Sequence, residues 1–429
     1  DPRRGEGHEA VLTRIRLDPA ADEVLARQGL SRDSVPAPGR EVLLRTAANL
    51  SAGGTASDRT GEIHPDNAAI ARRAALAVGL DVAGVDLLAP DIRRSIRETG
   101  GGVVEVNAAP GLRMHLAPSE GQARDVARPI IASLYPRGAP SRIPVLAVTG
   151  TNGKSTVGRM LAHIFRAQGK VVGLTNTSGV YIGDEQVAAT DASGPKSARM
   201  VLRDPTVEVA VLECARGGIL REGLAFDRCD VGAVLNVQPD HLGLKGIDTL
   251  EDLAAVKSVV VESVSRRGVS VLNADDPLTI RMARHAGGRV CWFSLRGGEQ
   301  APGFLLKHIA DGGAAVLHEP DTDEIVLHDR GRRQLICRAA GIPATLEGHA
   351  VFNVQKALAA AAMAWGAGAP PAAIGEALGS FRSTFEQNPG RMNLHEEHGF
   401  RVILDYAHNP EALRALGRRV LSLTREADV

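Results

Sequence analysis

The 429-residue sequence contains few aromatic residues and few cysteines. Phe, Trp and Tyr make up only 3% of it, which favours α/β layers packed by Ala, Val, Leu and Gly over an aromatic-rich β-sandwich. The four cysteines, Cys214, Cys229, Cys291 and Cys337, lie far apart and form no C-x-x-C pair. A structural zinc site and a disulfide framework are therefore disfavoured, and reduced thiols are expected.

The sequence also lacks an excess of charge of either sign and lacks long apolar runs. Its 50 basic and 50 acidic residues give a formal net charge of zero, which gives no indication of a nucleic acid or an anionic lipid surface as partner. No apolar run reaches the roughly 18 residues that indicate a membrane-spanning helix, and no signal peptide is recognisable. We expect a cytoplasmic protein without nucleic-acid or membrane partners.

A Pro- and Gly-rich stretch, "YPRGAPSRIP" at residues 135–144, is the first clear break in the sequence. We expect three domains, at residues 1–136, 137–386 and 387–429, with a second break near "EQNPGR". Residues 296–345 are expected to form a small β-rich insertion with the strands "GFLLKHI", "AAVLHE" and "EIVLHD". Because the sequence begins without Met and ends just after a predicted strand and the start of a helix, we expect a piece of a longer protein.

The stretch "VTGTNGKSTVGRM", residues 148–160, follows an apolar run that predicts a buried parallel strand. A loop between such a strand and a helix presents free backbone N–H groups to an anion, and glycines let a phosphate approach closely. The spacing differs from the common phosphate loop G-x-x-x-x-G-K-[ST], because Val148 stands where that pattern has its first glycine. The predicted helix after the loop has one apolar face, formed by Val157, Met160, Leu161, Ile164 and Phe165.

Polar residues end three further apolar runs of the predicted sheet: Glu213, Asn236 and Asn273. Ligands of open α/β sheets bind at the carboxyl ends of the strands, where the loop also lies. Glu213 is therefore expected to face a bound Mg²⁺, although an acid at a strand end is also common as a solvated turn residue. His241 follows another strand end by a few residues, and together with the loop it favours a site for phosphate and a hard cation.

The motif "GTNGKST" closely resembles the ATP loop of the Mur ligases and folylpolyglutamate synthases, which has the same shortened spacing. The resemblance continues through "DHLG", "LNADDP", "GR" and "DYAHNP" in the family's order. It implies an α/β fold in which a P-loop central ATP-binding domain is followed by a Rossmann-like C-terminal domain, beginning here at residue 387. It also implies ATP and Mg²⁺ as cofactors.

The same resemblance assigns roles to individual residues. It gives catalytic roles to Lys154, His241 and Lys257, the last as a carbamylated lysine, with an ordinary helix lysine as the alternative. It implies that Ser155, Glu213 and His241 bind Mg²⁺. Its ATP contacts are Gly150, Thr151, Asn152, Gly153, Lys154, Ser155, Thr156, Asn353, Arg391 and Asp405. The sequence departs from the family's H-N-x-x-N pattern, because the matching stretch reads "FNVQK" and keeps only Asn353.

The region before the linker contains a second set of oxygen-bearing side chains. Asp86 is expected at the end of an apolar strand in "AGVDLL", and Glu105 and Asn107 lie two apart on one strand face in "GGVVEVNAAPG". Such ligands suit Mg²⁺, although a polar edge strand has the same pattern. The arrangement resembles the C-terminal part of an ATP-grasp domain, in which these residues would hold Mg²⁺ at the ATP phosphates. The Gly-rich stretch at residues 45–60 is either an anion site or a flexible loop, with candidate side chains Arg45, Asn49 and Ser51.

An ATP-grasp module followed by a Mur-like module resembles the cyanophycin synthetase family. The resemblance implies that the first site adds Asp to a poly-Asp backbone and that the second adds Arg to the Asp β-carboxylates, both through acyl phosphates. The implied partners are the amino acids, a polymer primer and further copies of the chain. The alternatives are another Mur- or folylpolyglutamate-type amino-acid ligase, a nucleotide-driven switch, or a catalytically incomplete nucleotide-binding piece. Two arginines either hold a substrate carboxylate or are structural, namely Arg216 and Arg221.

Overall fold

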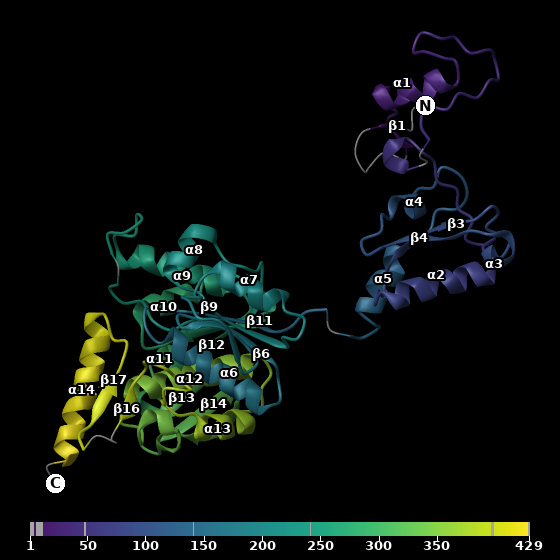
Figure 1. Cartoon of the computed structure of the whole chain (residues 1–429). Helices are drawn as coiled ribbons and strands as arrows, with labels where there is room; N and C mark the ends of the chain where they lie inside the picture. Colours follow the sequence, from purple (N-terminus) through teal and green to yellow (C-terminus); the bar gives the residue numbers. More distant parts are fainter. Residues whose placement is uncertain are drawn as a thin grey trace. The chain divides into compact units, whose positions relative to one another are not determined.

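The computed structural model describes residues 4–5, 12–46, 49–139, 141–240, 242–395 and 399–427 (Figure 1). The chain divides into two compact units, Asp1–Ser141 and Arg142–Val429. The first boundary therefore falls inside the Pro- and Gly-rich stretch. The second unit includes residues 387–429, so a separate third domain stays a prediction.

The first unit combines two small sheets with short helices. Its strands are β1 (Arg4–Gly5), β2 (Leu12–Thr13), β3 (Gly84–Leu88) and β4 (Gly102–Asn107). Its helices are α1 (Pro19–Arg27), η1 (Leu50–Ala52), α2 (Pro65–Ala77), α3 (Ile96–Thr99), α4 (Arg113–Leu116) and α5 (Ala127–Leu134). β1 and β2 pair in parallel, whereas β3 and β4 form an antiparallel pair. The antiparallel pair carries the polar residues singled out in the sequence.

The second unit is built on one eleven-stranded sheet. In spatial order its strands are β15 (Arg332–Arg338), β14 (Glu324–Asp329), β13 (Ala314–Glu319), β12 (Arg289–Ser294), β11 (Val264–Asn273), β10 (Cys229–Val234), β5 (Val145–Thr149), β9 (Val209–Glu213), β6 (Val172–Asn176), β7 (Gly179–Ile182) and β8 (Glu185–Ala188). The strands from β13 to β6 run parallel, and two antiparallel strands extend the sheet at each edge. A separate antiparallel pair near the C-terminus consists of β16 (Asn393–His395) and β17 (Val402–Leu404).

Helices cover both faces of this sheet, which gives three layers (Figure 1). One face packs against α6 (Lys154–Ala167), α12 (Val351–Gly366) and α13 (Pro371–Ser380). The other face packs against α7 (Pro195–Arg203), α9 (Leu250–Glu262), α10 (Pro277–Met282) and α11 (Gly303–Ala310). The remaining helices are α8 (Arg216–Glu222), η2 (Gly298–Gln300), η3 (Ala339–Gly341), η4 (Pro343–Thr345) and α14 (Pro410–Ala427). The predicted α/β class of the central region is confirmed.

Local sequence explains the two helices nearest the phosphate-loop motif. The apolar face expected for α6 is buried against the sheet, and burying each of its large side chains contributes roughly 1.5–3 kcal/mol. α9 begins with a capping box, in which the Thr249 side chain accepts from the Asp252 N–H and the Asp252 carboxylate accepts from the Thr249 N–H. Both helices therefore have defined starting points beside the strand ends.

The prediction of a separate β-rich insertion is wrong in two respects. The stretch "GFLLKHI" forms helix α11, in which Leu305 is fully buried and His308 and Ile309, three and four residues later, are partly buried, while Phe304 and Leu306 are 40% and 46% exposed. That pattern suits one helical face and not a strand. The strands expected at "AAVLHE" and "EIVLHD" are present as β13 and β14, but they extend the main sheet through pairing of β13 with β12. No helix in the described ranges is long and apolar enough to cross a membrane.

Candidate functional site

The phosphate-loop motif lies between the end of β5 and the start of α6. Gly153 is the residue before α6 and has φ 92°, a left-handed conformation that favours glycine. Gly150 approaches the next strand closely, since a Cβ added there would lie 2.9 Å from Leu235 Cβ. The two glycines are thus required by backbone shape and by space, and the loop opens at the positive end of the α6 helix.

The segment after β10 holds this loop in place. Asn236 Oδ1 accepts from the Asn152 N–H at 2.9 Å, and Asn236 Nδ2 donates to the Asn152 carbonyl at 3.1 Å. Thr151 Oγ1 donates to the Gln238 carbonyl at 3.1 Å and accepts from the Gln238 N–H at 3.0 Å. Sequence reasoning noted Asn236 only as a polar strand end and gave Gln238 no role, although both fix the loop.

The distant stretch "DYAHNP" also holds the loop in place through hydrogen bonds. Asn152 and Asn409 exchange two side-chain hydrogen bonds, of 2.8 Å and 3.3 Å. Asn409 is 4% exposed, and its Oδ1 also accepts from the Ala412 N–H at the start of α14. Asn409 therefore ties the loop to the first turn of α14, a role that sequence reasoning missed because no local pattern signals it.

Lys154 and Ser155 lie where the motif predicts. The Lys154 ammonium donates to the carbonyls of Gly150 and Thr151, each at 3.1 Å, so it stays over the loop. Ser155 Oγ donates to Glu213 Oε2 at 2.8 Å and lies 2.9 Å from Thr177 Oγ1. The structure therefore brings together two predicted Mg²⁺ ligands, and it adds Thr177 from the turn after β6.

Glu213 is the last residue of β9 and is only 3% exposed. The alternative of a solvated turn residue does not describe this position. Thr177 Oγ1 lies 3.5 Å from its second carboxylate oxygen. A buried carboxylate whose hydrogen-bond partners among the described residues are hydroxyl groups presents hard oxygen atoms to the cavity.

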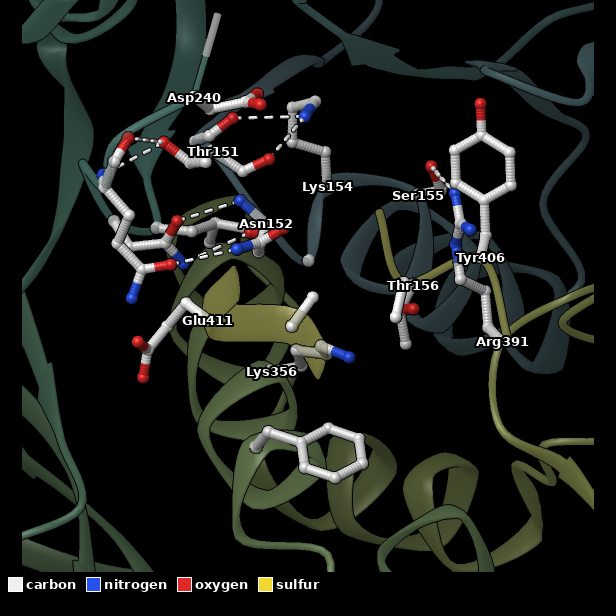
Figure 2. A pocket seen from close by; sticks show the side chains of 18 of the residues that line it. Thr151, Asn152, Lys154, Ser155, Thr156, Asp240, Lys356, Arg391, Tyr406 and Glu411 are labelled. Atoms are coloured by element: carbon white, nitrogen blue, oxygen red, sulfur yellow. Dashed lines mark hydrogen bonds between the residues drawn. The ribbon is translucent and has the colours of Figure 1, made fainter. Parts of the chain in front are cut away.

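Two predicted nucleotide contacts from the C-terminal segment, Arg391 and Asp405, line the same cavity, and Figure 2 shows Arg391 beside Tyr406. The Arg391 guanidinium lies 3.5 Å from Ser155 Oγ and stacks over the Tyr406 ring at 4.6 Å from its centroid. Burial lowers the pKa of Arg391, and the Glu213 and Asp405 carboxylates oppose that shift. Asp405 Oδ2 accepts from the Met392 N–H at 2.8 Å, which ties β17 to the chain before β16.

Lys257 on α9 lines the cavity and is 3% exposed. Burial lowers the pKa of its ammonium to about 7, the positive charge of Lys154 adds to that shift, and Asp240 opposes it. Lys257 is therefore a buried lysine of α9, and the choice between a carbamylated lysine and an ordinary helix lysine stays a prediction. The other predicted member of this group, His241, lies outside the described residues, so its role stays a prediction.

The structure does not bring Asn353 to the cavity surface. Its Nδ2 donates to the Ala344 carbonyl at 2.6 Å, its Oδ1 accepts from Lys356 at 3.0 Å, and the residue is 1% exposed. The neighbours Phe352, Gln355 and Lys356 line the cavity instead. Asn353 thus orients Lys356, and a direct nucleotide contact from Asn353 stays a prediction.

These side chains surround one cavity of about 880 Å³ at the carboxyl ends of the central strands. Besides the loop, its lining includes the two arginines of α8 (Arg216 and Arg221), Asp240, His408 and Glu411. The volume lies in the range of small-molecule and cofactor sites. Basic, acidic and hydroxyl groups therefore converge at a single place in the second unit.

The loop and its surroundings fit a nucleotide and Mg²⁺. A Cβ at Gly150 would fill the space beside the loop, and Thr156 Oγ1 is a buried hydroxyl that has no hydrogen-bond partner among the described residues. Ser155, Thr177 and Glu213 present hydroxyl and carboxylate oxygens, and Mg²⁺ typically takes one or two carboxylates together with phosphates and water. The described residues contain no group of three or more His, Cys, Asp or Glu side chains that suits a metal.

The polar residues of the first unit come together on the β3–β4 pair. Asp86 lies in the middle of β3 rather than at its end, directly opposite Glu105. Asn107 donates to Glu105 Oε1 at 3.0 Å. Both carboxylates are exposed, so this arrangement is compatible with the Mg²⁺ prediction and with a polar edge strand alike.

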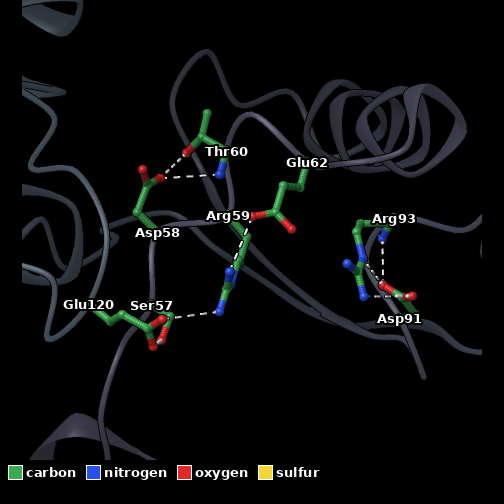
Figure 3. A network of polar contacts seen from close by, with 8 residues as sticks. All are labelled: Ser57, Asp58, Arg59, Thr60, Glu62, Asp91, Arg93 and Glu120. Atoms are coloured by element: carbon green, nitrogen blue, oxygen red, sulfur yellow. Dashed lines mark hydrogen bonds and ion pairs between the residues drawn. The ribbon is translucent and has the colours of Figure 1, made fainter.

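Residues 57–60, at the end of the Gly-rich stretch of the first unit, take part in a network of polar contacts (Figure 3). Asp58 accepts from the Thr60 hydroxyl at 2.6 Å and pairs with Arg124 at 2.9 Å. Arg59 reaches Glu62 and Glu120 at 3.2 Å and 3.4 Å. Arg45, a candidate anion contact, instead forms a two-pronged ion pair with Asp18, which lowers the pKa of that carboxyl to about 2. Arg45 is therefore paired with Asp18, and the choice between an anion site and a flexible loop stays a prediction.

Comparison with known proteins agrees with the geometry of the second unit. The model of the Mur ligase middle domain matches residues 148–364, half of the chain, including the loop, Glu213 and Lys257. The chain belongs to the Mur ligase family. The fold and the resemblance drawn from "GTNGKST" are confirmed for this region.

Relatives extend the match to nearly the whole chain. A cyanophycin synthetase from Geminocystis herdmanii is 51% identical over 416 residues, which is 97% of this chain and 47% of that protein. One from Crocosphaera subtropica is 49% identical over 421 residues, 98% of this chain and 48% of that protein. The predicted resemblance to this family is confirmed, and the chain spans about half the length of these curated relatives.

A third relative matches a shorter part. The glutathione biosynthesis bifunctional protein GshAB from Clostridium perfringens is 34% identical over 135 residues, which is 32% of this chain and 17% of that protein. The ATP-grasp assignment of the first unit and the Rossmann-like assignment of residues 387–429 stay predictions.

Proposed function

We propose that the second unit is the ATP-binding part of an amide ligase that activates a carboxylate and joins it to an amine. The observation that carries this proposal is the convergence of the loop, Ser155, Glu213 and Arg391 on one cavity of about 880 Å³. No serine, cysteine or histidine nucleophile is needed, because phosphoryl transfer depends mainly on positioning and charge stabilisation.

When bound, ATP with Mg²⁺ supplies the phosphoryl group that turns a carboxylate into a reactive acyl phosphate. The loop N–H groups and Lys154 hold the phosphates at the N-terminus of α6. Ser155 and Glu213 are the residues placed to hold Mg²⁺. Arg391 brings a further positive charge from the C-terminal segment to Ser155. Each group acts by neutralising or orienting negative charge.

We assign Lys257 and His241 to a second Mg²⁺ position, with Lys257 as a carbamate. The lowered pKa of Lys257 supports its assignment as a carbamate, since a neutral amine is the form that reacts with carbon dioxide. Arg216 and Arg221 line the same cavity, where guanidinium groups suit a substrate carboxylate. These assignments place the amino-acid substrate on the α8 and α9 side of the loop.

For the whole chain we propose the cyanophycin synthetase reactions. The first unit would add Asp to a poly-Asp backbone, with Asp86, Glu105 and Asn107 at Mg²⁺, and the second unit would add Arg to the Asp β-carboxylates. The support is the 48–51% identity to cyanophycin synthetases. A polymer primer and a homo-oligomer belong to the same proposal.

The experiment has two arms. First, ATP with Mg²⁺ is titrated into the 429-residue chain by calorimetry, and Lys154→Ala serves as the control that should lose the binding component of the second unit while keeping that of the first. Second, ADP release is measured with Asp, Arg and a cyanophycin primer, added singly and together. The proposal expects ADP release only when the matching amino acid and primer are present.

The other outcomes separate the alternatives. ADP release without amino acids would indicate a nucleotide-driven switch. Release that responds to other amino acids but not to Asp or Arg would indicate a different Mur- or folylpolyglutamate-type ligase. ATP binding without any release would indicate a catalytically incomplete nucleotide-binding piece. Absence of ATP binding would overturn the site itself.

A further inference from the structure

Lys356 is a basic residue of the cavity to which the sequence motifs assign nothing. It lies on the second turn of α12, two positions after the end of "FNV", and it lines the cavity. Its stem packs against the loop, since a Cβ added to Gly153 would lie 3.4 Å from both Cγ and Cε of Lys356. Gly153 directly precedes Lys154, so the Lys356 side chain runs beside the point where the phosphate loop becomes α6 (Figure 2).

The positive charge of Lys356 has little compensation from protein. Its Nζ donates to Asn353 Oδ1 at 3.0 Å and lies 4.8 Å from the centre of the Phe352 ring. Within the described part of the chain, no carboxylate lies within 4 Å of this ammonium to form an ion pair. An ammonium has three donors, and one neutral amide satisfies one of them.

The surroundings of Lys356 disfavour an uncompensated charge. Burial lowers the pKa of its ammonium to about 8, the Arg391 charge adds to that shift, and only the Asp405 carboxylate opposes it. A half-buried cation without an ion-pair partner costs free energy that a bound anion would recover. The side chain is nonetheless held at one place by Asn353, whose Nδ2 is itself fixed to the Ala344 carbonyl.

We propose that Lys356 is a second phosphate-binding lysine of this cavity, contacting a phosphate oxygen of the bound nucleotide from the α12 side of the loop. Phosphate fits better than the base, because an ammonium gains most from a charged oxygen and because the Lys356 stem lies against Gly153, where the loop N–H groups converge. The inference rests on the proposed nucleotide site and deepens it. Lys154 and Lys356 would then hold the phosphates from two sides.

The test compares nucleotides that differ only in phosphate number. ATP, ADP, AMP and adenosine, each with Mg²⁺, are titrated into the 429-residue chain and into Lys356→Met, which keeps the length of the side chain and removes the charge. We expect ATP affinity to fall roughly ten- to hundredfold, as for a hydrogen bond to a charged group, and adenosine affinity to change less than about threefold. Lys356→Arg should stay within about threefold of the parent chain for every ligand.

A control variant and a replacement variant guard against effects of the substitution that are unrelated to phosphate binding. Lys196→Met, at an exposed position on α7, is the matched control and should change nothing. If Lys356→Met fails to fold, as judged by its thermal unfolding, Lys356→Gln takes its place, and the ratio of ATP to adenosine affinity within that variant gives the answer.

The outcomes distinguish this inference from the proposed function. An equal loss for all four ligands would assign Lys356 to the base or to structure, and no loss for ATP would remove it from the phosphate site. Either result overturns the inference, whereas the nucleotide site of the second unit stands as long as the parent chain shows a component of ATP binding that Lys154→Ala removes. Failure of the parent chain to bind ATP would overturn both.

Discussion

Both units carry carboxylate side chains at their predicted Mg²⁺ sites, but these carboxylates differ in burial and in hydrogen bonding. In the second unit, Glu213 is 3% exposed and accepts from the Ser155 hydroxyl at 2.8 Å. In the first unit, Asp86 and Glu105 are both exposed, and the Glu105 carboxylate accepts only from Asn107 among the polar residues singled out beside it. Similar ligand atoms are therefore preorganised in one unit and solvated in the other.

The sheets explain this difference. Glu213 ends a strand that is paired on both sides within an eleven-stranded sheet, with helices on both faces. Asp86 and Glu105 lie on a two-stranded pair. A parallel sheet brings loops from distant parts of the chain to one edge, where each orients the next, whereas a two-stranded pair orients only its own residues. The local sequence therefore decides which ligand atoms are present, whereas the surrounding sheet decides whether those atoms are held in place before a ligand binds.

The largest expected effect comes from removing the loop ammonium. Lys154→Ala should lower ATP-dependent Arg incorporation by roughly a hundred- to a thousandfold, because it removes a preorganised positive charge from the phosphates. Asp incorporation should survive in part, because that reaction is assigned to the other unit. Incorporation of radiolabelled Asp and Arg into a cyanophycin primer measures both. Normal Arg incorporation by this variant would contradict the assignment of the second unit.

A reciprocal pair of carboxamide variants should sharpen the comparison. Glu213→Gln is expected to raise the Mg²⁺ concentration needed for half-maximal Arg incorporation and to lower its rate roughly ten- to hundredfold. Glu105→Gln should act on Asp incorporation and leave Arg incorporation within about twofold. Titrating Mg²⁺ in the same incorporation assay separates the two units. If both variants impaired both reactions equally, the two clusters would not be independent sites.

Lys257→Met should change stability in a way that depends on pH. Because burial lowers the pKa of the folded lysine to about 7 while the unfolded lysine keeps a value near 10.5, the unfolded chain binds more protons between these values. Stability of the parent chain should therefore gain a contribution from this group as pH rises from 7 to 10.5. Lys257→Met should remove that contribution and stabilise the protein at pH 7 by about 1–3 kcal/mol.

Urea unfolding of the parent and Lys257→Met chains at pH 7 and pH 10 measures this difference. Lys196→Met, on an exposed face of α7, serves as the control and should leave the pH dependence unchanged. A pH dependence that is identical in Lys257→Met and the parent would show that Lys257 does not titrate as a free amine of lowered pKa, and mass spectrometry of the parent chain for a carbamate then separates a carbamylated from a fully charged lysine. Arg incorporation by Lys257→Met is expected to be lost, since the variant has no amine.

The smallest expected effect concerns the hydrogen-bonded pair Asn152 and Asn409, which joins the loop to the start of α14. Asn409→Ala should lower stability by about 0.5–1.5 kcal/mol, the usual net contribution of a hydrogen bond, and should weaken ATP binding only severalfold. Because Asn409 also caps α14, Asn152→Ala and the double variant are needed to isolate the pair. A coupling energy near zero in this cycle, measured by urea unfolding, would mean that the two amides act independently.

Patterns that are local in the chain were predictable. The loop between β5 and α6, the apolar face of α6 and the oxygen ligands Ser155 and Glu213 follow from spacing and from strand ends, and the structure places them together. α11 was missed because a short apolar run suits a strand or a helix, and only the burial of Leu305 together with His308 and Ile309, at helical spacing, decides between them. Asn353 was assigned from a resemblance in which its neighbours differ, and the structure turns its amide towards the Ala344 carbonyl.

The sequence by itself determined the family, the glycines that shape the loop and the helical period that buries α6, since each depends on residues close together in the chain. Only the tertiary structure decided which polar groups meet. Arg391 reaches Ser155 across 236 residues, Asn409 reaches Asn152 across 257 residues, and Lys356 reaches the loop from α12. These contacts depend on how the parallel sheet aligns the ends of its strands, which no local pattern encodes.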